Sequence, residues 1–208
     1  MTISKDPINL VITGVGGQGN LLASQLTAAA ALQEGFYASI GETYGASQRG
    51  GSVMSHVRLS KEFQYGPLIP RGEADIILGF EPLETLRVLV DYGNDDTRVI
   101  FNPRPNYPIS VLTGQQKYPP LADLFSRIKE LAGAALVVKA TELAKELGAL
   151  VSQNVVMVGA LAGSGLVPAP FSNFRETIAE VFEDEGKREF NLKALELGVR
   201  GYKEAQDL

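Results

Sequence analysis

A glycine-rich turn between a strand-like run and a helix-like run constrains the fold of this chain most. Residues 8–13 are aliphatic and β-branched, the motif GVGGQG follows at residues 14–19, and residues 21–33 are rich in Ala and Leu. Glycines at these positions let the backbone turn sharply and let the amide N–H groups of the helix start approach a negative charge. The motif therefore predicts a strand, a tight turn and a helix, with room for a phosphate-bearing ligand.

Further strand-like and helix-like runs follow along the chain. Strands are predicted at residues 36–40, 53–59, 75–80, 97–101 and 134–138. Helices are predicted at residues 83–89, at 141–147, and at 155–167, where Gly, Ala and Ser indicate a buried, closely packed helix. This order predicts a three-layer α/β/α Rossmann-like fold with a mostly parallel or mixed central sheet. We expect a single domain over residues 1–208, because no repeat or low-complexity linker interrupts the chain.

The C-terminal segment, residues 171–208, has helical periodicity throughout. Aromatic and aliphatic residues recur at helical spacing over residues 171–182 and again over residues 192–202. Asn173 and Glu176 are spaced as a helix cap and its partner three residues on. The two helices would present an apolar face either to the core or to a neighbouring protein.

Composition excludes several classes of function. The chain has no cysteine, so it cannot form disulfides or ligate an iron–sulfur cluster through thiolates. Its single histidine, His56, leaves no second imidazole for a metal site, and a structural role is the better interpretation for it. With 19 basic against 24 acidic residues, the net charge of −5 argues against nucleic-acid binding. Neither a secretory signal nor a membrane span is predicted, which indicates a cytoplasmic protein.

A second constellation lies at residues 42–52, where Arg49 is followed by Gly50 and Gly51. A guanidinium can form paired hydrogen bonds with phosphate or carboxylate oxygens, and glycines let backbone amides approach the same anion. Because ligands of doubly wound sheets bind at the carboxyl ends of the strands, this loop and the glycine-rich turn are expected at one edge. Glu42, 23 residues after Gly19, could serve as the acidic residue that a nicotinamide dinucleotide requires.

Two further polar residues follow predicted strands and should reach the same edge. Glu81 comes after residues 75–80, and Asn102 comes after residues 97–101. Since Glu81 precedes Pro82 and a helix, its carboxylate is better interpreted as a helix cap than as a catalytic group. No serine lies in a nucleophile-elbow motif, so hydrolase chemistry is not supported.

Four motifs together resemble a known family. They are GVGGQG at 14–19, ETYGASQRGGSVMSHVRLS at 42–60, PLIPRGEADIILGFEPLETLR at 67–87, and NVVMVGALAGSGL at 154–166. In this order they resemble the gamma-type subunits of 2-oxoacid:ferredoxin oxidoreductases, in particular those of the indolepyruvate enzymes. The resemblance extends from about residue 10 to residue 198. Two positions depart from it: Tyr44 stands where a histidine is expected, and Asn20 where an aliphatic residue is commoner.

The resemblance implies a subunit of a hetero-oligomer. The complex would oxidatively decarboxylate indolepyruvate or another arylpyruvate with coenzyme A, giving acyl-CoA and carbon dioxide and reducing ferredoxin. A large alpha subunit would carry thiamine diphosphate, magnesium and iron–sulfur clusters, and this chain would hold no catalytic residue and no metal. It would contribute coenzyme A binding through these residues: Gly16, Gly17, Gln18, Gly19, Ser47, Gln48, Arg49 and Gly50.

Two alternatives remain open from the sequence. One is a self-sufficient NAD(P)-dependent oxidoreductase, for which Tyr44 is the only nearby proton donor. The other is a non-enzymatic nucleotide-binding module that needs no large partner.

Overall fold

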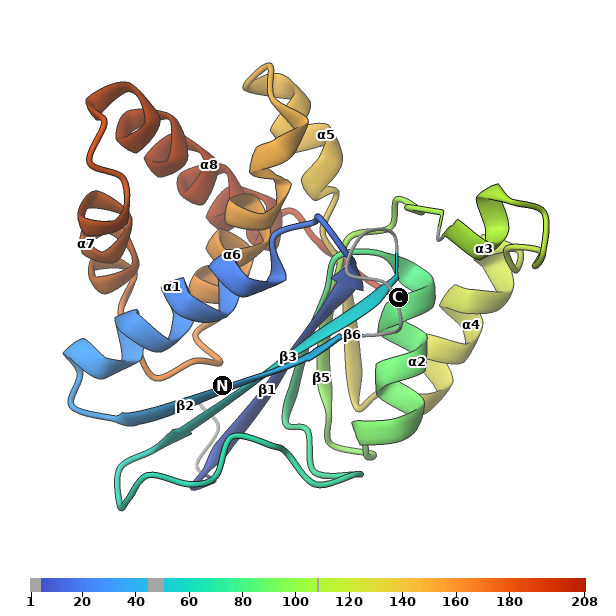
Figure 1. The fold of residues 1–208 in the computed structure, drawn as a ribbon, viewed down its shortest axis with the longest axis horizontal. Coiled ribbons are helices and arrows are strands. Elements are labelled where there is room, and N and C mark those ends of the chain that lie inside the picture. The colour runs from blue at the N-terminus through green and yellow to red at the C-terminus, as the bar shows by residue number, and fades with distance from the viewer. Residues whose placement is uncertain (1–4, 45–50, 108) are drawn as a thin grey trace.

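The computed structural model describes residues 5–44, 51–107 and 109–208. These residues form one mixed sheet of seven strands, in the order β2-β3-β1-β4-β5-β6-β7, between two layers of helices (Figure 1). The strands are β1 (Ile8–Val15), β2 (Tyr37–Tyr44), β3 (Ser52–Ser60), β4 (Ile76–Gly79), β5 (Arg98–Phe101), β6 (Ala134–Val137) and β7 (Gln206–Asp207). β1, β4, β5 and β6 run parallel to one another, whereas β3 and β7 are antiparallel to their neighbours. The prediction of a mixed α/β sheet is confirmed.

Helices cover both faces of the sheet. The described helices are α1 (Asn20–Gln33), α2 (Pro82–Tyr92), α3 (Ile109–Leu112), α4 (Leu121–Leu131), α5 (Ala140–Glu146), the 3₁₀ turn η1 (Leu150–Ser152), α6 (Gln153–Ser164), α7 (Phe171–Val181) and α8 (Glu185–Lys203). α1, α5, α6, α7 and α8 share one hydrophobic core with the sheet, and α2 and α4 pack on its other face (Figure 1). The three-layer α/β/α arrangement predicted from the sequence is therefore present. No helix in the described part of the chain is long and apolar enough to cross a bilayer.

Strand β3 separates β2 from β1, because it pairs antiparallel with both. Two antiparallel steps make β2 parallel to β1, so both strands end at the same edge of the sheet. β2 extends to Tyr44, beyond the predicted end at residue 40, and Glu42 therefore lies inside the strand, opposite Ser55 of β3. The expected common edge for the two glycine-containing turns follows from this topology.

Helices α6 and α8 pack at very close range. A Cβ atom added at Gly159 would lie 2.1 Å from the carbonyl oxygen of Leu195, and one at Gly198 would lie 2.0 Å from that of Val156. Only glycine fits at such a contact, so the prediction of a buried, closely packed helix is confirmed. The helix ends earlier than predicted, at Gly165, whose φ of 66° stops it in the left-handed region.

The C-terminal segment corrects two predictions. α7 begins at Phe171, and Asn173 lies inside it rather than capping it. The Asn173 side chain instead donates hydrogen bonds to the Ala30 carbonyl (3.2 Å) and to the Glu34 carboxylate (2.9 Å), which joins α7 to α1. α8 begins seven residues before the predicted helix start at residue 192, at Glu185, with Asp184 as its cap. Both helices dock on the core.

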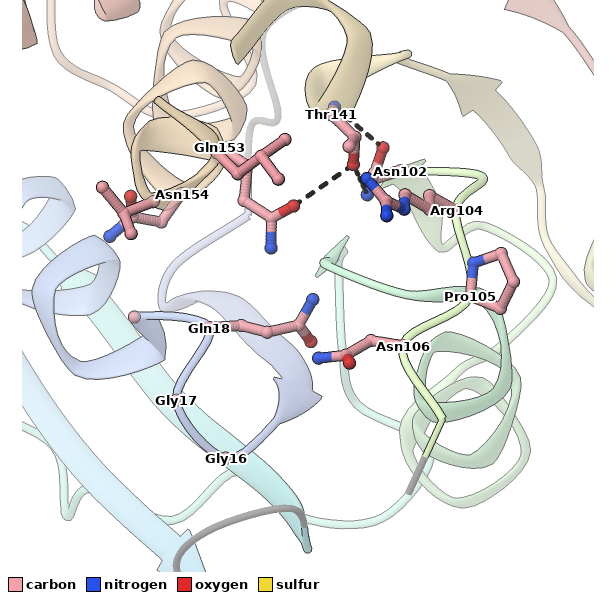
Figure 2. Close-up of a pocket in the computed structure, with 13 residues that line it drawn as sticks. Gly16, Gly17, Gln18, Asn102, Arg104, Pro105, Asn106, Thr141, Gln153 and Asn154 are labelled. Atoms are coloured by element: carbon pink, nitrogen blue, oxygen red, sulfur yellow. Dashed lines mark hydrogen bonds between the residues drawn. The ribbon is translucent and has the colours of Figure 1, made fainter. Parts of the chain in front are cut away.

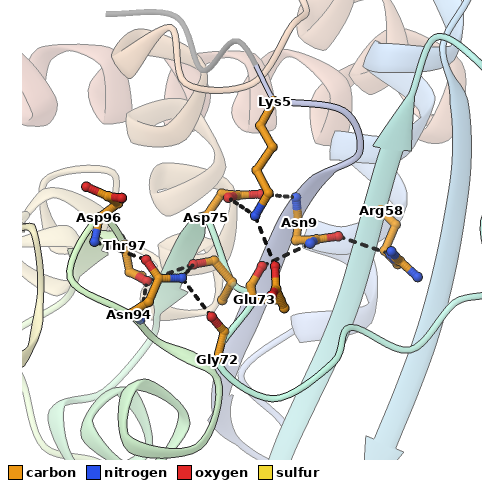
Figure 3. A network of polar contacts seen from close by, with 10 residues as sticks. Lys5, Asn9, Arg58, Gly72, Glu73, Asp75, Asn94, Asp96 and Thr97 are labelled. Atoms are coloured by element: carbon orange, nitrogen blue, oxygen red, sulfur yellow. Dashed lines mark hydrogen bonds and ion pairs between the residues drawn. The ribbon is translucent and has the colours of Figure 1, made fainter.

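A polar network fixes the amino-terminal end of the sheet (Figure 3). The Asp75 carboxylate accepts a hydrogen bond from the Asn9 backbone N–H at 2.8 Å and pairs with the Lys5 ammonium at 3.0 Å. The Arg58 Nε–H donates to the Asn9 side chain at 3.0 Å, which adds β3 to the network. This end is opposite the glycine-rich turn, so its polar groups stabilise the strands and leave the carboxyl edge for a ligand.

Candidate functional site

The glycine-rich turn requires glycine at two positions. Gly17 and Gly19 have φ angles of 101° and 87°, in the left-handed region that other residues rarely adopt. A Cβ atom at Gly17 would meet only open space, whereas one at Gly19 would lie 2.2 Å from the side-chain nitrogen of Asn154. Within the described residues, the backbone N–H groups of Gly17 and Gly19 have no hydrogen-bond partner. The turn therefore offers amide donors to a ligand at the start of α1.

Gln18 holds the turn against the sheet. Its side-chain oxygen accepts a hydrogen bond from the Val15 N–H at 2.7 Å, and its side-chain nitrogen donates to the Phe80 carbonyl at 3.2 Å. The side chain is buried, with 8% exposed. Gln18 was predicted as a ligand-binding residue; it does line the pocket described next, but its amide is already committed to the backbone.

A pocket of about 400 Å³ opens at this edge of the sheet (Figure 2). It lies between the glycine-rich turn, the segment after β5, and the starts of α5 and α6. Its lining comprises Gly16, Gly17, Gln18, Gly19, Asn102, Arg104, Pro105, Asn106, Thr141, Leu150, Val151, Gln153 and Asn154. All four glycine-turn residues predicted to bind a ligand are in this group, and so is Asn102.

The wall opposite the turn is a hydrogen-bonded polar network. The Asn102 side-chain nitrogen donates to the Phe80 carbonyl at 3.2 Å and to the Thr141 hydroxyl at 3.0 Å. The Thr141 hydroxyl in turn donates to the Gln153 side-chain oxygen at 3.2 Å (Figure 2). Since the Phe80 carbonyl also accepts from Gln18, one backbone group at the end of β4 links the two sides of the pocket. The lining is preorganised rather than loose.

The pocket is electropositive. Arg104 is the one ionisable residue among those that line it, and its guanidinium takes part in no ion pair among the described residues. Helices α1 and α6 both begin at the pocket, so the positive ends of their dipoles converge on it. An exposed guanidinium, unpaired amides and helix starts together favour an anionic ligand.

Sequence reasoning missed Arg104, although the rule that selected Asn102 extends to it. Both residues follow β5 at the carboxyl edge of the sheet. The cation chosen from the sequence was Arg49, in a different turn. Ser47, Gln48, Arg49 and Gly50 lie outside the described residues, but Gly51 is described, and its carbonyl accepts a hydrogen bond from the Gly16 N–H at 2.8 Å. Gly51, directly before β3, therefore lies beside the glycine-rich turn.

Glu42, the acidic residue considered for a nicotinamide ribose, is hydrogen-bonded to serines of neighbouring elements. The Glu42 carboxylate accepts hydrogen bonds from the hydroxyls of Ser55 at 2.7 Å and Ser24 at 3.1 Å. Moreover, β3 lies between β1 and β2, so Glu42 is two strand spacings, about 9–10 Å, from β1. This geometry does not favour the NAD(P) alternative.

Glu81 caps α2, as the preferred interpretation held. Its carboxylate accepts a hydrogen bond from the Glu84 N–H at the helix start and another from the Tyr118 hydroxyl at 2.9 Å. The side chain is fully buried, and this burial raises the pKa of Glu81 above its ordinary value. Burial next to the Glu81 carboxylate likewise raises the pKa of Tyr118.

His56 has the structural role expected of it. It is 1% exposed, and its Nδ1 accepts a hydrogen bond from the Ile69 N–H at 3.3 Å. Its ring packs edge-on against the ring of Tyr92, with the two ring centroids 5.3 Å apart. Burial, with a smaller contribution from Arg58, lowers the pKa of His56. Asn20 is also structural: its side-chain nitrogen lies 3.3 Å from each of the Ile12 and Val53 carbonyls, to which it donates.

The described residues offer no set of metal ligands. In the described ranges no three His, Cys, Asp or Glu side chains gather closely enough to hold an ion. The whole chain also lacks cysteine. The residues present therefore do not fit an iron–sulfur cluster.

Comparison with known proteins decides the family. Residues 9–201 match the family model described as pyruvate ferredoxin/flavodoxin oxidoreductase. The chain belongs to this family. It is 40% identical over 197 residues to the indolepyruvate oxidoreductase subunit IorB of Thermococcus kodakarensis, covering 94% of this chain and 96% of IorB. The corresponding subunit of Pyrococcus horikoshii is 39% identical, covering 96% of this chain and 98% of that protein.

Solved structures of the family share the fold. The pyruvate oxidoreductase subunit PORC of Thermotoga maritima superposes with a TM-score of 0.69 at 23% identity, covering 98% of this chain and 99% of PORC. A 2-oxoglutarate:ferredoxin oxidoreductase from Magnetococcus marinus, solved with 2-oxoglutarate, coenzyme A and succinyl-CoA bound, superposes with a TM-score of 0.75 at 22% identity. The match covers 97% of this chain and 32% of that one. The chain is thus an IorB-like subunit of the 2-oxoacid:ferredoxin oxidoreductases, which confirms the resemblance seen in its motifs.

Proposed function

We propose that this subunit binds coenzyme A for its complex, in the pocket between the glycine-rich turn and Arg104. The observation that carries the proposal is the convergence there of unpaired amides, two helix starts and one unpaired guanidinium on about 400 Å³ of space. The diphosphate of coenzyme A is an anion that such donors suit. A Magnetococcus marinus enzyme containing a domain of this fold was solved with coenzyme A bound, which supports the choice of ligand.

In this proposal the carbon chemistry takes place on a large partner subunit. That subunit holds thiamine diphosphate with magnesium, and it also holds the iron–sulfur clusters. This chain has no cysteine and cannot ligate such clusters through thiolates. The complex removes carbon dioxide from a 2-oxoacid, passes the electrons to oxidised ferredoxin, and joins the acyl group to the thiol sulfur of coenzyme A with release of the thiol proton. Indolepyruvate or another arylpyruvate is the substrate that the IorB relatives suggest.

In this proposal the residues of this chain bind coenzyme A and orient it. The Gly17 and Gly19 amides donate to the phosphates, Arg104 supplies a fixed positive charge, and the Asn102–Thr141 hydrogen bond keeps the facing wall in place. Gln18 acts by holding the turn, since its amide is bonded to the backbone. Residues 47–50 remain proposed ligands as well, because their neighbour Gly51 is bonded to Gly16.

Steady-state kinetics of the reconstituted complex test the proposal. A charge-assisted contact contributes about 1.5–3 kcal/mol, so Arg104→Ala should raise the KM for coenzyme A about tenfold or more. The kcat should change little, because the contact holds the ground state and the transition state alike. Arg71→Ala is the matched control, since Arg71 lies in the loop before β4, away from the pocket, and should leave the KM unchanged. An unchanged KM in Arg104→Ala would contradict the proposal.

A further inference from the structure

The segment that carries Arg104 leaves the sheet at the end of β5 and has little freedom to change shape. Pro103 and Pro105 stand on either side of Arg104 in the sequence, and each proline ring fixes one φ angle of the backbone. Among the described residues, no backbone–backbone hydrogen bond is made by residues 103–107. The position of Arg104 therefore depends on how the two ends of this stiff segment are held.

The first end of the segment is held by the sheet. The backbone N–H of Asn102 donates to the Gly79 carbonyl at 2.9 Å, and the Asn102 side chain is bonded to the Phe80 carbonyl. At the other end, the ring of Tyr107 packs edge-on against the ring of Tyr118, with the centroids 5.1 Å apart and the planes at 84°. Aromatic pairs favour this geometry, so the contact holds the segment although Tyr107 is 48% exposed.

Tyr118 gives Tyr107 a fixed support. Its hydroxyl donates a hydrogen bond to the fully buried carboxylate of Glu81 at 2.9 Å. Two prolines connect Tyr118 to α4, and α4 packs against the core of the sheet through Phe125. Glu81 directly follows Phe80, so the end of β4 supports the segment of residues 102–107 at both ends.

We propose that Tyr107 is a positioning residue for Arg104; this inference rests on the proposed function. Asn106, the neighbour of Tyr107, lines the pocket together with Arg104, on the side that faces the glycine-rich turn (Figure 2). With Asn102 and Tyr107 both held, the guanidinium stays at the pocket. Without the Tyr107 ring the segment can swing about Asn102, and Arg104 meets the anion for only part of the time.

Kinetics of the reconstituted complex test this role. Tyr107→Ala should raise the KM for coenzyme A about three- to tenfold and change the kcat little, because only binding through Arg104 is weakened. Tyr107→Phe keeps the ring contact and should retain the wild-type KM. Phe63→Ala is the matched control: Phe63 is 51% exposed, packs on the Tyr65 ring at 4.3 Å, and follows the end of β3, which lies beside the start of β1. The control should leave the KM unchanged.

A double-mutant cycle separates positioning from a merely structural effect. If Tyr107 acts through Arg104, adding Tyr107→Ala to Arg104→Ala should raise the KM for coenzyme A by less than about twofold, because no guanidinium is left to position. If Tyr107→Ala raises the KM by the same factor in both backgrounds, the two residues act independently and the inference is refuted.

The outcomes also distinguish this inference from the proposed function. If Arg104→Ala raises the KM for coenzyme A while Tyr107→Ala leaves it unchanged, the positioning role is refuted and the binding pocket stands. If Arg104→Ala has no effect, the proposed function itself fails. If the effect of Tyr107→Ala disappears when the large subunit is added in excess, Tyr107 acts in subunit assembly and the inference is overturned.

Discussion

The backbone N–H of Gly16 donates a hydrogen bond to the carbonyl of Gly51 at 2.8 Å. This bond joins two residues that lie 35 positions apart in the sequence, one directly after β1 and one directly before β3. It continues the antiparallel pairing of Val15 with Ser52 beyond the ends of both strands. The glycine-rich turn is therefore fixed on one side by β3 and on the other by the bond between Gln18 and Phe80.

Substitution of Gly19 should cost more stability than substitution of Gly17. Both residues have left-handed backbone conformations, so alanine at either position should cost about 1–3 kcal/mol. At Gly19 the added methyl group also collides with the Asn154 side chain, whereas at Gly17 it meets open space. Urea unfolding of Gly19→Ala and Gly17→Ala measures the difference. Equal losses in the two variants would show that Asn154 does not restrict the turn.

The contact between α6 and α8 should tolerate no side chain at Gly198. Alanine there places a Cβ 2.0 Å from the Val156 carbonyl oxygen, so the helices must move apart, at a cost of about 3 kcal/mol or more. Gly186→Ala on the same helix is the control, because its nearest neighbour, a carboxylate oxygen of Asp184, is 3.4 Å away. The control should gain up to about 1 kcal/mol from helix propensity. Thermal unfolding of both variants tests this, and a Gly198→Ala protein as stable as wild type would contradict the packing.

His56 should make the protein less stable in mild acid. Its folded-state pKa is lowered by burial, so below about pH 6.5 the unfolded chain takes up a proton that the folded chain does not. Stability is therefore fully present above the unfolded pKa and is lost as the pH falls, by at most about 1.4 kcal/mol per pH unit. His56→Gln removes this dependence, so the stability difference between wild type and variant should shrink from pH 7.5 to pH 5.5. A difference that stays constant would mean that His56 titrates alike in both states.

Tyr118 should stabilise the buried carboxylate of Glu81 only while that carboxylate is charged. Loss of the hydroxyl in Tyr118→Phe removes a hydrogen bond that contributes about 1.5–3 kcal/mol when its acceptor is ionised, so the cost should be largest at a pH where the Glu81 carboxyl has lost its proton. Because the Tyr118 hydrogen bond lowers the pKa of Glu81, the variant should raise that pKa further, and the cost should diminish as the pH falls and Glu81 is protonated. Chemical unfolding across pH measures this, with Tyr37→Phe, at an exposed ring on β2, as the control. A cost independent of pH would contradict the claim that Tyr118 stabilises Glu81 only in its charged form.

The sequence predicted the local parts of this fold better than their arrangement. Residues 8–33 specify strand, turn and helix through short-range pattern, and that unit forms as expected. The direction of β3 could not be derived, because alternation along a strand says nothing of which neighbour it pairs with or in which sense. Asn173 has the spacing of a cap, but a long-range bond to Ala30 overrides that local preference.

The sequence predicted the candidate site only in part, because local patterns do not reveal how distant elements pack together. The glycine-rich turn and Asn102 follow strands, and the rule for carboxyl edges finds them. Gln153 and Asn154 come from the start of α6, which only the tertiary packing of that helix against α1 brings to the pocket. Arg104 lies in irregular chain after β5, where periodicity gives no signal and only the rule for carboxyl edges could have indicated it.

Hydrogen–deuterium exchange of the whole complex, with and without coenzyme A, tests the central claim most directly. Residues 16–22, which include the unpaired amides of Gly17 and Gly19, should exchange more slowly when coenzyme A is present, and residues 102–106 should follow them. The same peptides of Arg104→Ala should show this protection only at about tenfold higher coenzyme A concentration. Protection confined to the large subunit, with no change at residues 16–22, would contradict the account.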